Sequence, residues 1–432
     1  MSEGAALGSR SSPKTKDENT EITFLLGQAR SGDRNAQLTL AGHYDAGYGV
    51  ARDMGLAAHW YLAAAQQGSV EAQGRIGSKY LHGIGLDQDF DKAFQWLRLA
   101  AAADNADAIA EMGWSYQTGT GQKKNVRKAY KCYLRAAEIG HVSSAFNLGY
   151  MCAEGIGTEQ DFSRAMYWYT QAAGQGNPQA QVNLGEMFAK SMGTRSNYVA
   201  AVEWFRRAAE QDYPKAQYNL GHMYATGHGV PMDGAEAVRW YRKAANQEYG
   251  RAQYELGQCF LEGRGVEQSA VEAMNWFLKA SFHDYPKARY QIGRMYAEGL
   301  GVPEEPLEAV HWFLAAAEAG YARAQYRMGR ACAKGEGTLK DIGLACKWYQ
   351  KAAQQGLTQA QYQLGLCYMK GVGVERDPVL GYAWLYTAAL AGEAKVLRAL
   401  NKIREHLDVG PLIKAEKLGQ RYRSEYAVHT EE

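Results

Sequence analysis

The sequence has little proline, no paired cysteine motif and no long apolar run. Only 9 of its 432 residues are proline, against 48 glycines and 29 tyrosines, which favours helices joined by regular glycine-containing turns. The six cysteines are Cys132, Cys152, Cys259, Cys332, Cys346 and Cys367. They form no CxxC motif, so we expect free thiols in a reducing compartment. No segment approaches the roughly 18 apolar residues of a membrane span, and the start lacks an apolar signal region, which predicts a cytoplasmic protein.

The chain also lacks an excess of charge of either sign. It carries 48 basic and 46 acidic side chains, a formal net charge of +2. This balance provides no general attraction to nucleic acid or to a membrane surface. We therefore expect neither nucleic-acid binding nor membrane insertion.

What the sequence has instead is one pattern, repeated. "AQYNLGHMYATGHGV" begins at residue 216, "AQYELGQCFLEGRGV" at 252 and "AQYQLGLCYMKGVGV" at 360, so the starts differ by 36 and by four times 36 residues. One series at this spacing is Tyr44, Tyr80, Tyr116, Cys152, Phe188, Tyr224, Phe260, Tyr296, Cys332 and Tyr368. Another is Trp60, Trp96, Cys132, Trp168, Trp204, Trp240, Trp276, Trp312, Trp348 and Trp384. A fixed period of this length predicts stacked supersecondary units.

The first half of each repeat has helical spacing. Ala216, Leu220 and Tyr224 recur at i, i+4 and i+8 and therefore lie on one face. The central glycine of this helix, Gly221, costs about 1 kcal/mol relative to alanine, and its recurrence predicts that a second helix approaches closely. The glycines of the "GHGV" turn predict a left-handed helix C-cap and a tight loop.

The second half of each repeat reads as another helix. Its expected N-cap positions are Asp53, Asp89, Asn125, Asp161, Asn197, Asp233, Ser269, Glu305, Asp341 and Asp377. All but Glu305 carry a side chain that readily accepts from free backbone N–H groups. Within this helix Ala237, Trp240, Tyr241 and Ala244 form one buried face, where large aromatic side chains meet alanines.

These patterns divide the chain into four parts. We expect a disordered tail at residues 1–16, a capping helix at 17–32, ten repeats at 33–392 and capping helices at 393–428. In the N-terminal cap, Phe24 takes the tryptophan position and Asp17 the N-cap position. After the last repeat, Val396 and Leu400 keep the register of a first helix while the rest of the pattern fades.

The pattern A-x-x-x-L-G-x-x-Y-x-x-G-x-G-V-x-x-D-x-x-x-A-x-x-W-Y-x-x-A-A, over roughly residues 33–392, closely resembles the Sel1-like repeat family, a relative of the tetratricopeptide repeat. The resemblance implies an all-α, right-handed α/α superhelical solenoid with the first helices lining its concave groove. It also implies a non-catalytic adaptor or scaffold for protein–protein interactions, typical of bacterial signalling, secretion or cell-envelope pathways.

On such a groove, the position two residues after the leading alanine should point inward. From the fourth repeat onward it holds Phe146, Val182, Tyr218, Tyr254, Tyr290, Tyr326 and Tyr362. Basic residues precede the alanine at Lys215, Arg251, Lys287 and Arg323, and His222, Arg294 and Arg330 follow the central glycine. This predicts a tyrosine ladder with a basic edge that binds a partner peptide carrying acidic and apolar residues. In the alternative interpretation the tyrosines only pack between first helices, and the basic residues form a solvated face.

No catalytic or cofactor motif is recognisable in the sequence. The paired glycines lie between two helices and lack the GK[ST] of a phosphate-binding loop, HExxH is absent, and His222 and His228 flank a turn on different faces. We therefore expect no cofactor, no metal and no enzymatic activity. The rival function is a sensor or regulator that binds a small anion or a glycan fragment in the groove.

Two repeats depart from the pattern. The third has Cys132 in the tryptophan position and Trp114 beside its central glycine, and the fifth has "SMGTRSN" where the others keep two glycines. We expect bending or early fraying at these two layers.

Overall fold

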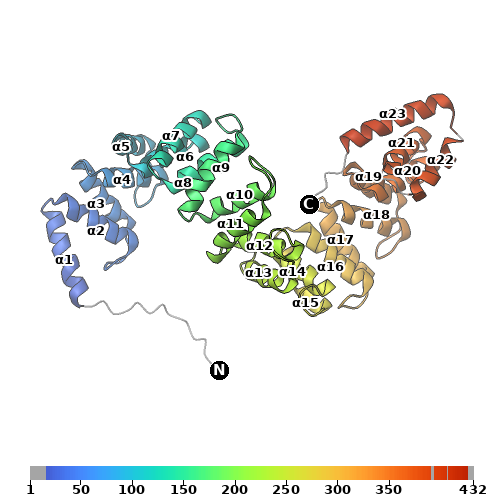
Figure 1. Cartoon of the computed structure of the whole chain (residues 1–432), viewed down its shortest axis with the longest axis horizontal. Coiled ribbons are helices and arrows are strands. Elements are labelled where there is room, and N and C mark those ends of the chain that lie inside the picture. Colours follow the sequence, from blue (N-terminus) through green and yellow to red (C-terminus); the bar gives the residue numbers. More distant parts are fainter. Residues whose placement is uncertain (1–15, 391–393, 406, 427–432) are drawn as a thin grey trace, which may run out of the picture. The chain divides into compact units, whose positions relative to one another are not determined.

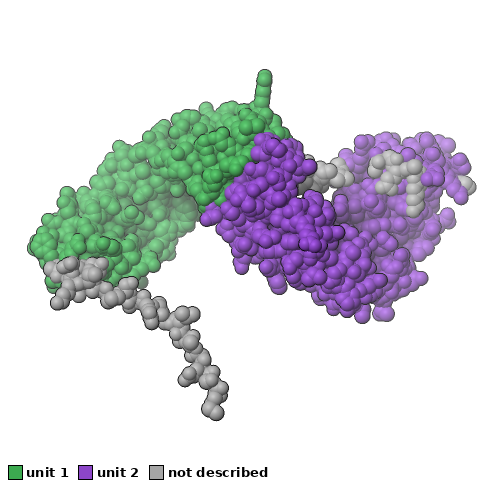
Figure 2. Space-filling model, turned by 60° about the horizontal axis from the view of Figure 1, so that its bottom comes forward, with its two compact units in different colours: residues 1–211 green, residues 212–432 purple. Residues whose placement is uncertain are grey.

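A computed structural model describes residues 16–390, 394–405 and 407–426. Within these residues the regular secondary structure is entirely helical. The chain divides into two compact units, residues 1–211 and 212–432, which are coloured separately in Figure 2. Each unit is described by itself.

Unit 1 begins with a single helix and continues with five helix pairs (Figure 1). Its helices are α1 (Lys16–Arg30), α2 (Arg34–Ala46), α3 (Met54–Gln66), α4 (Val70–His82), α5 (Phe90–Ala102), α6 (Ala106–Thr118), α7 (Val126–Glu138), α8 (Val142–Glu154), α9 (Phe162–Gly174), α10 (Pro178–Ala189) and α11 (Tyr198–Glu210). The even-numbered helix of each pair is the first helix of a repeat and the odd-numbered one is the second.

Unit 2 contains five further pairs and two terminal helices. Its helices are α12 (Pro214–Thr226), α13 (Gly234–Asn246), α14 (Gly250–Glu262), α15 (Ala270–Ser281), α16 (Pro286–Glu298), α17 (Pro306–Glu318), α18 (Ala322–Lys334), α19 (Ile342–Gln354), α20 (Thr358–Lys370), α21 (Pro378–Ala389), α22 (Ala394–Arg404) and α23 (Val409–Glu425). Within both units each first helix packs on its own second helix, and that second helix packs on the next first helix. This is an α/α solenoid, which confirms the predicted fold class.

The central glycines explain the tight helix pairs. A Cβ atom on Gly257 of α14 would lie 2.7 Å from the Phe277 ring of α15, and one on Gly221 of α12 would lie 2.8 Å from the Tyr241 ring of α13. Both distances are too short for a carbon–carbon contact. The predicted packing need is therefore confirmed: glycine lets the aromatic ring of the second helix lie directly on the first.

The two glycines of each turn have different roles. Gly263 has φ +69° and its N–H bonds the Cys259 carbonyl, so it closes α14 as a left-handed C-cap. Gly265 also has a positive φ, +73°, but a Cβ there would lie 2.1 Å from the carbonyl of Gly234, at the start of α13 in the preceding repeat. The second glycine therefore makes a close backbone contact between consecutive layers, which the sequence did not predict.

The N-cap prediction for the second helices holds in detail. Nine of the ten N-cap side chains accept a backbone N–H: Asp53, Asp89, Asn125, Asp161, Asn197, Asp233, Ser269, Asp341 and Asp377. The exception is Glu305, which makes no such bond and is followed by Pro306 at the first helical position.

The ends differ slightly from expectation. α1 begins at Lys16, which places Asp17 inside the first turn and not at the N-cap, while residues 1–15 lie outside the described chain. At the other end, the ring of Trp384 on α21 stacks on Tyr422 of α23, with centroids 4.4 Å apart. Because α23 covers the tryptophan of the last repeat, no further repeat is needed to bury it.

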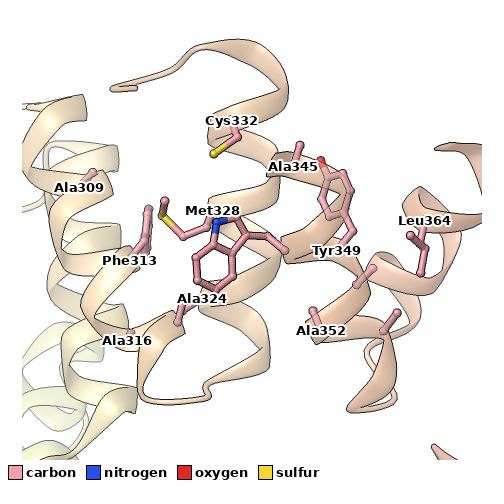
Figure 3. Close-up of a cluster of buried hydrophobic side chains, with 14 of the residues drawn as sticks. Ala309, Phe313, Ala316, Ala324, Met328, Cys332, Ala345, Tyr349, Ala352 and Leu364 are labelled. Atoms are coloured by element: carbon pink, nitrogen blue, oxygen red, sulfur yellow. The ribbon is translucent and has the colours of Figure 1, made fainter. Parts of the chain in front are cut away.

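The core consists of small clusters between layers. In unit 2, Phe313 of α17 and Met328 of α18 point toward each other, and alanines such as Ala316 and Ala324 leave room for them (Figure 3). Buried glutamines also form hydrogen bonds between helices. Gln325 of α18 donates to the carbonyl of Ala317, eight residues earlier, at 3.1 Å. This bond connects a first helix to the preceding second helix.

In each of the two irregular repeats the structure shows a feature that lowers local stability. In the third repeat, Ile109 occupies the position that corresponds to Gln325, and its side chain cannot donate a hydrogen bond to the preceding second helix. In the fifth, Ser191 adopts φ +60° where other repeats have glycine, a conformation that costs a non-glycine residue about 1–2 kcal/mol.

We therefore expect amide exchange about ten-fold faster, or about 1.4 kcal/mol less protection, in α6 and around Ser191 than at matched positions of α14 and α16. Exchange followed by mass spectrometry measures this. Equal protection along all layers would contradict it.

Candidate functional site

The tyrosine ladder lies on the first helices of unit 2 and is half-buried. Each of its first four tyrosines contacts an aromatic ring on the second helix of its own repeat. The ring centroids are 5.9 Å apart for Tyr218–Tyr241, 5.7 Å for Tyr254–Phe277, 5.6 Å for Tyr290–Phe313 and 5.9 Å for Tyr326–Tyr349. Tyr362, the fifth, packs against the cluster of apolar side chains around α21. The packing role of these rings is thus present, and each of these side chains remains partly exposed to solvent.

A second set of tyrosines joins the ladder, and sequence reasoning missed it. These residues occupy the N-cap positions of the next first helices, where they make no side-chain cap bond. Ring centroids are 5.5 Å apart for Tyr218–Tyr249, 5.1 Å for Tyr254–Tyr285 and 5.3 Å for Tyr290–Tyr321. The signal was available, because Tyr213, Tyr249, Tyr285 and Tyr321 also recur every 36 residues.

Burial raises the pKa of two tyrosines of the ladder. It raises the pKa of Tyr218 to about 12, with the nearby Glu255 carboxylate adding to the effect and Arg251 opposing it. It also raises the pKa of Tyr254, again chiefly by desolvation. At physiological pH these side chains are therefore neutral hydrogen-bond donors.

The four basic residues that precede the leading alanines differ in their exposure to solvent. Arg251 and Arg323 are exposed and Lys287 is half-buried, and none of them takes part in an ion pair among the described residues. Lys215, the fourth residue of the basic edge, is half-buried on α12.

The two arginines beside the central glycines differ from each other. Arg294 is held by Glu298, with Nη2 and Oε2 3.0 Å apart, and by Gln291 at 3.2 Å. Arg330 is half-buried and belongs to no ion pair in the described chain. Arg294 is therefore less available to a partner than its position in the sequence suggested.

Glu255 is a residue of this surface that the sequence interpretation missed. It is half-buried on α14, one position after Tyr254. Burial raises the pKa of its carboxyl, and the positive charges of Arg264 and Lys287 partly offset this. Its position in the repeat, three residues after the leading alanine, is polar in all ten repeats: Thr39, Arg75, Glu111, Asn147, Asn183, Asn219, Glu255, Gln291, Arg327 and Gln363. That polar series is the signal that could have found it.

Unit 1 has a different feature on its first helices, a cavity of about 710 Å³. Its lining comes mainly from α2, α4, α6 and α8 and the turns next to them, with Met54 of α3 and Tyr133 of α7. In the ladder position of these repeats stand Gly74 and Ala110 instead of tyrosine, and both line the cavity. The missing rings leave the space open.

Pairs of polar side chains join neighbouring first helices across this cavity. Lys79 Nζ lies 2.6 Å from Asp45 Oδ1, and His82 Nε2 lies 3.1 Å from Glu111 Oε2. His141 caps α8: its Nδ1 accepts from the Ser144 N–H, so the neutral ring carries its proton on Nε2, 3.4 Å from an oxygen of Asp107. Three pairs of one acidic and one basic side chain thus connect four consecutive first helices, α2, α4, α6 and α8.

The described residues show no sign of a metal centre or a membrane span. No group of three or more His, Cys, Asp or Glu side chains in the described ranges could hold a metal ion. Over the same residues, no helix combines the length and the apolar character that crossing a bilayer requires. The six cysteines are unpaired, and four of them are buried.

Stacked helix pairs with open first-helix surfaces define a helical-repeat protein of the α/α solenoid class. A family model described as the Sel1 repeat matches ten consecutive segments, namely residues 35–69, 70–105, 106–141, 142–177, 178–213, 214–249, 250–281, 286–321, 322–357 and 358–393. The chain belongs to the Sel1 repeat family. Proteins with such repeats generally mediate protein–protein interactions and are generally non-catalytic scaffolds.

Two solved structures of this family are similar to the chain. One is a protective antigen of uropathogenic Escherichia coli with an SLR fold, 34% identical, with a TM-score of 0.79 and coverage of 96% of this chain and 89% of that chain. The other is a Sel1 repeat protein from Oxalobacter formigenes, also 34% identical, with a TM-score of 0.59 and coverage of 72% and 90%. No curated protein sequence matches the chain.

Proposed function

We propose that the protein is a non-catalytic adaptor whose unit 2 binds a peptide segment of a partner protein along the tyrosine ladder. The observation that supports this most directly is the combination of half-exposed ladder tyrosines with Arg251, Lys287 and Arg323, which lack ion-pair partners in the described chain. Tyrosine provides a large, rigid contact with a polar end, and arginine provides forked donors for carboxylates. The partner segment would carry acidic and apolar residues.

The setting of this adaptor would be a bacterial signalling, secretion or cell-envelope pathway. Bacterial origin of both similar structures supports the bacterial setting.

Within the array, α1 and the pair α22 and α23 would act as caps of the ten repeats.

The charge-reversal variant Arg251→Glu/Lys287→Glu/Arg323→Glu tests the proposal. We expect it to lose capture of the partner protein, because like charges would then face the partner's acidic residues, while its helical circular dichroism stays unchanged. The measurement is affinity capture followed by quantitative mass spectrometry, compared with the wild type.

A matched control reverses the same number of charges elsewhere in unit 2. Lys243, Lys279 and Lys351 lie over the rings of Trp240, Trp276 and Trp348 on the second helices, 4.5, 4.1 and 4.4 Å from the ring centroids. Reversing these three lysines should leave capture intact. Unchanged capture by the ladder variant, or equal loss in the control, would remove the proposal.

The alternative function, a sensor or regulator for a small anion or a glycan fragment, is favoured by a different observation. The cavity of unit 1 has a volume within the roughly 300–1,000 Å³ of small-molecule sites. Mass spectrometry of small molecules released from the purified protein tests this alternative.

A further inference from the structure

Four departures from the repeat pattern in unit 1 come together at one place. Gly74 and Ala110 replace ladder tyrosines, Trp114 is the one tryptophan outside the tryptophan series, and Lys79 stands where repeats four, five, six and eight have methionine. All four side-chain positions line the cavity of about 710 Å³. Independent loss of the pattern would scatter such exceptions over the surface, so their convergence indicates a built site.

The charges of the cavity favour no ion. Three cations, Arg52, Arg75 and Lys79, and four carboxylates, Asp45, Glu71, Asp107 and Glu111, line it together with two histidines. Asp45, Asp107 and Glu111 are already paired with Lys79, His141 and His82. A ligand of either net charge would meet like charges, whereas a neutral polar ligand meets none.

The groups that remain open offer donors and acceptors side by side. Arg75, Glu71 and Asn147 make no hydrogen bond or ion pair among the described residues. Lys79 is almost fully buried, and Asp45 is its only ion-pair partner in the described chain. Its ammonium group also lies 3.8 Å from Met54 Sδ and over the Tyr61 ring, 5.7 Å from the ring centroid, so at most one of its three N–H donors has no acceptor in the described chain. This mixture suits hydroxyl groups, each of which donates one hydrogen bond and accepts two.

Trp114 supplies a flat apolar surface in the same cavity. Its ring is half-buried on α6, 5.1 Å from the His82 ring between centroids, and its indole N–H has no acceptor within the described residues. An indole can therefore cover the apolar face of a ring-shaped ligand and bond a hydroxyl at its edge. The other apolar side chains of the lining belong to Met54, Ile84, Ala110 and Tyr133.

We propose that the cavity between α4, α6 and α8 of unit 1 binds a neutral oligosaccharide. One sugar ring lies against Trp114, and the hydroxyl groups bond Arg75, Glu71, Asn147 and Lys79. The inference develops the small-ligand alternative and does not depend on the adaptor role of unit 2.

The test uses an immobilised array of neutral oligosaccharides, with acidic oligosaccharides and peptides ending in a free carboxylate as competing probes. We expect the full-length protein to bind neutral members of the array, and titration calorimetry with the best of them to give a measurable affinity. No binding to neutral sugars, or a preference for the acidic sugars or the peptides, would overturn the proposal.

Ala110→Tyr is the decisive variant, because it restores the residue that repeats six to ten carry at this position. The new ring should lie on Tyr133 as Tyr218 lies on Tyr241, and so fill the cavity without unfolding the helices. We expect at least a ten-fold loss of sugar affinity with an unchanged melting temperature. Binding that persists in this variant would place the sugar elsewhere and refute the assignment.

Three further variants separate the contributions. Trp114→Phe should weaken sugar binding less than Trp114→Ala, because phenylalanine keeps a flat aromatic surface, although a smaller one, and loses the N–H. Tyr254→Ala in unit 2 should leave sugar binding intact, and Ala110→Tyr should leave partner capture intact. Failure of one proposal is then distinguishable from failure of the other.

Discussion

Gly265→Ala is expected to destabilise unit 2 by about 3–5 kcal/mol, because it combines a strained backbone with a clash that no side chain can relieve. The residue has φ +73°, and its Cβ would lie 2.1 Å from the carbonyl carbon and oxygen of Gly234. Those atoms belong to the backbone at the start of α13, so relief requires the two repeats to separate locally. The loss of stability should appear as a lower denaturation midpoint of the full chain.

Gly263→Ala is the matched control for this substitution. Gly263 also has a positive φ, +69°, but the nearest atom to its Cβ would be the Cβ of Gln268, at 3.3 Å, and the Gln268 backbone would lie at an ordinary 3.8 Å. We expect it to cost about 1–2 kcal/mol, the penalty of the left-handed conformation alone. Amide exchange in α13 and α15 should accelerate strongly in the first variant and weakly in the second. Equal effects of the two substitutions would show that the close backbone contact between layers contributes nothing to the free energy of unfolding.

The fold follows from the sequence because each of its determinants recurs at a fixed spacing. The series of Trp240 and Tyr224 sets the register, Asp233 and its equivalents mark the helix starts, and Gly221 marks the close contact. These are local properties of one repeat. Ten copies of a local signal are easily recognised, and stacking then follows from the need to bury the same face in each copy.

The role of Gly265 could not be deduced in the same way. The sequence predicts that a glycine in the turn adopts a positive φ, and it does. It does not show that the backbone of Gly234, in the preceding repeat, lies against it. That contact depends on the offset between layers, which no pattern within a repeat specifies.

The candidate site was predictable only in part, for a related reason. The ladder from Tyr218 to Tyr362 was found because its members share a position, and the structure places them together with the N-cap tyrosines. The cavity of unit 1 was missed because several residues that line it depart from the repeat pattern. Gly74, Lys79 and Trp114 occupy three different positions of the repeat, and only coordinates show that they border one space.

The two surfaces illustrate how a repeat protein can carry different binding sites on one scaffold. The position that holds Tyr254 in unit 2 holds Gly74 in unit 1. The Tyr254 ring packs on Phe277 of its own second helix, whereas Gly74 borders the cavity. At this position the two units therefore differ, with a packed tyrosine ring in one and the border of a cavity in the other.

The ion pair at the base of that cavity should have a strong and asymmetric effect on stability. Lys79 is 5% exposed and bonds Asp45, whose side chain is 31% exposed. Asp45→Ala leaves a buried ammonium without its partner, and we expect a loss of about 2–3 kcal/mol, below the roughly 3–5 kcal/mol of fully buried pairs because water reaches Asp45. Lys79→Met should cost less, since the remaining carboxylate can be hydrated.

The double variant Asp45→Ala/Lys79→Met is expected to regain most of the stability that Asp45→Ala loses. It installs the residues that other first helices carry at these positions, Ala153, Ala225 and Ala297 in one and Met151, Met223 and Met295 in the other. Chemical denaturation of the four proteins gives the coupling energy, expected at about 2 kcal/mol. Additive losses would mean that the pair contributes nothing as a pair. A rescued double variant would show instead that the repeat folds well without it, and that Lys79 serves the cavity more than the fold.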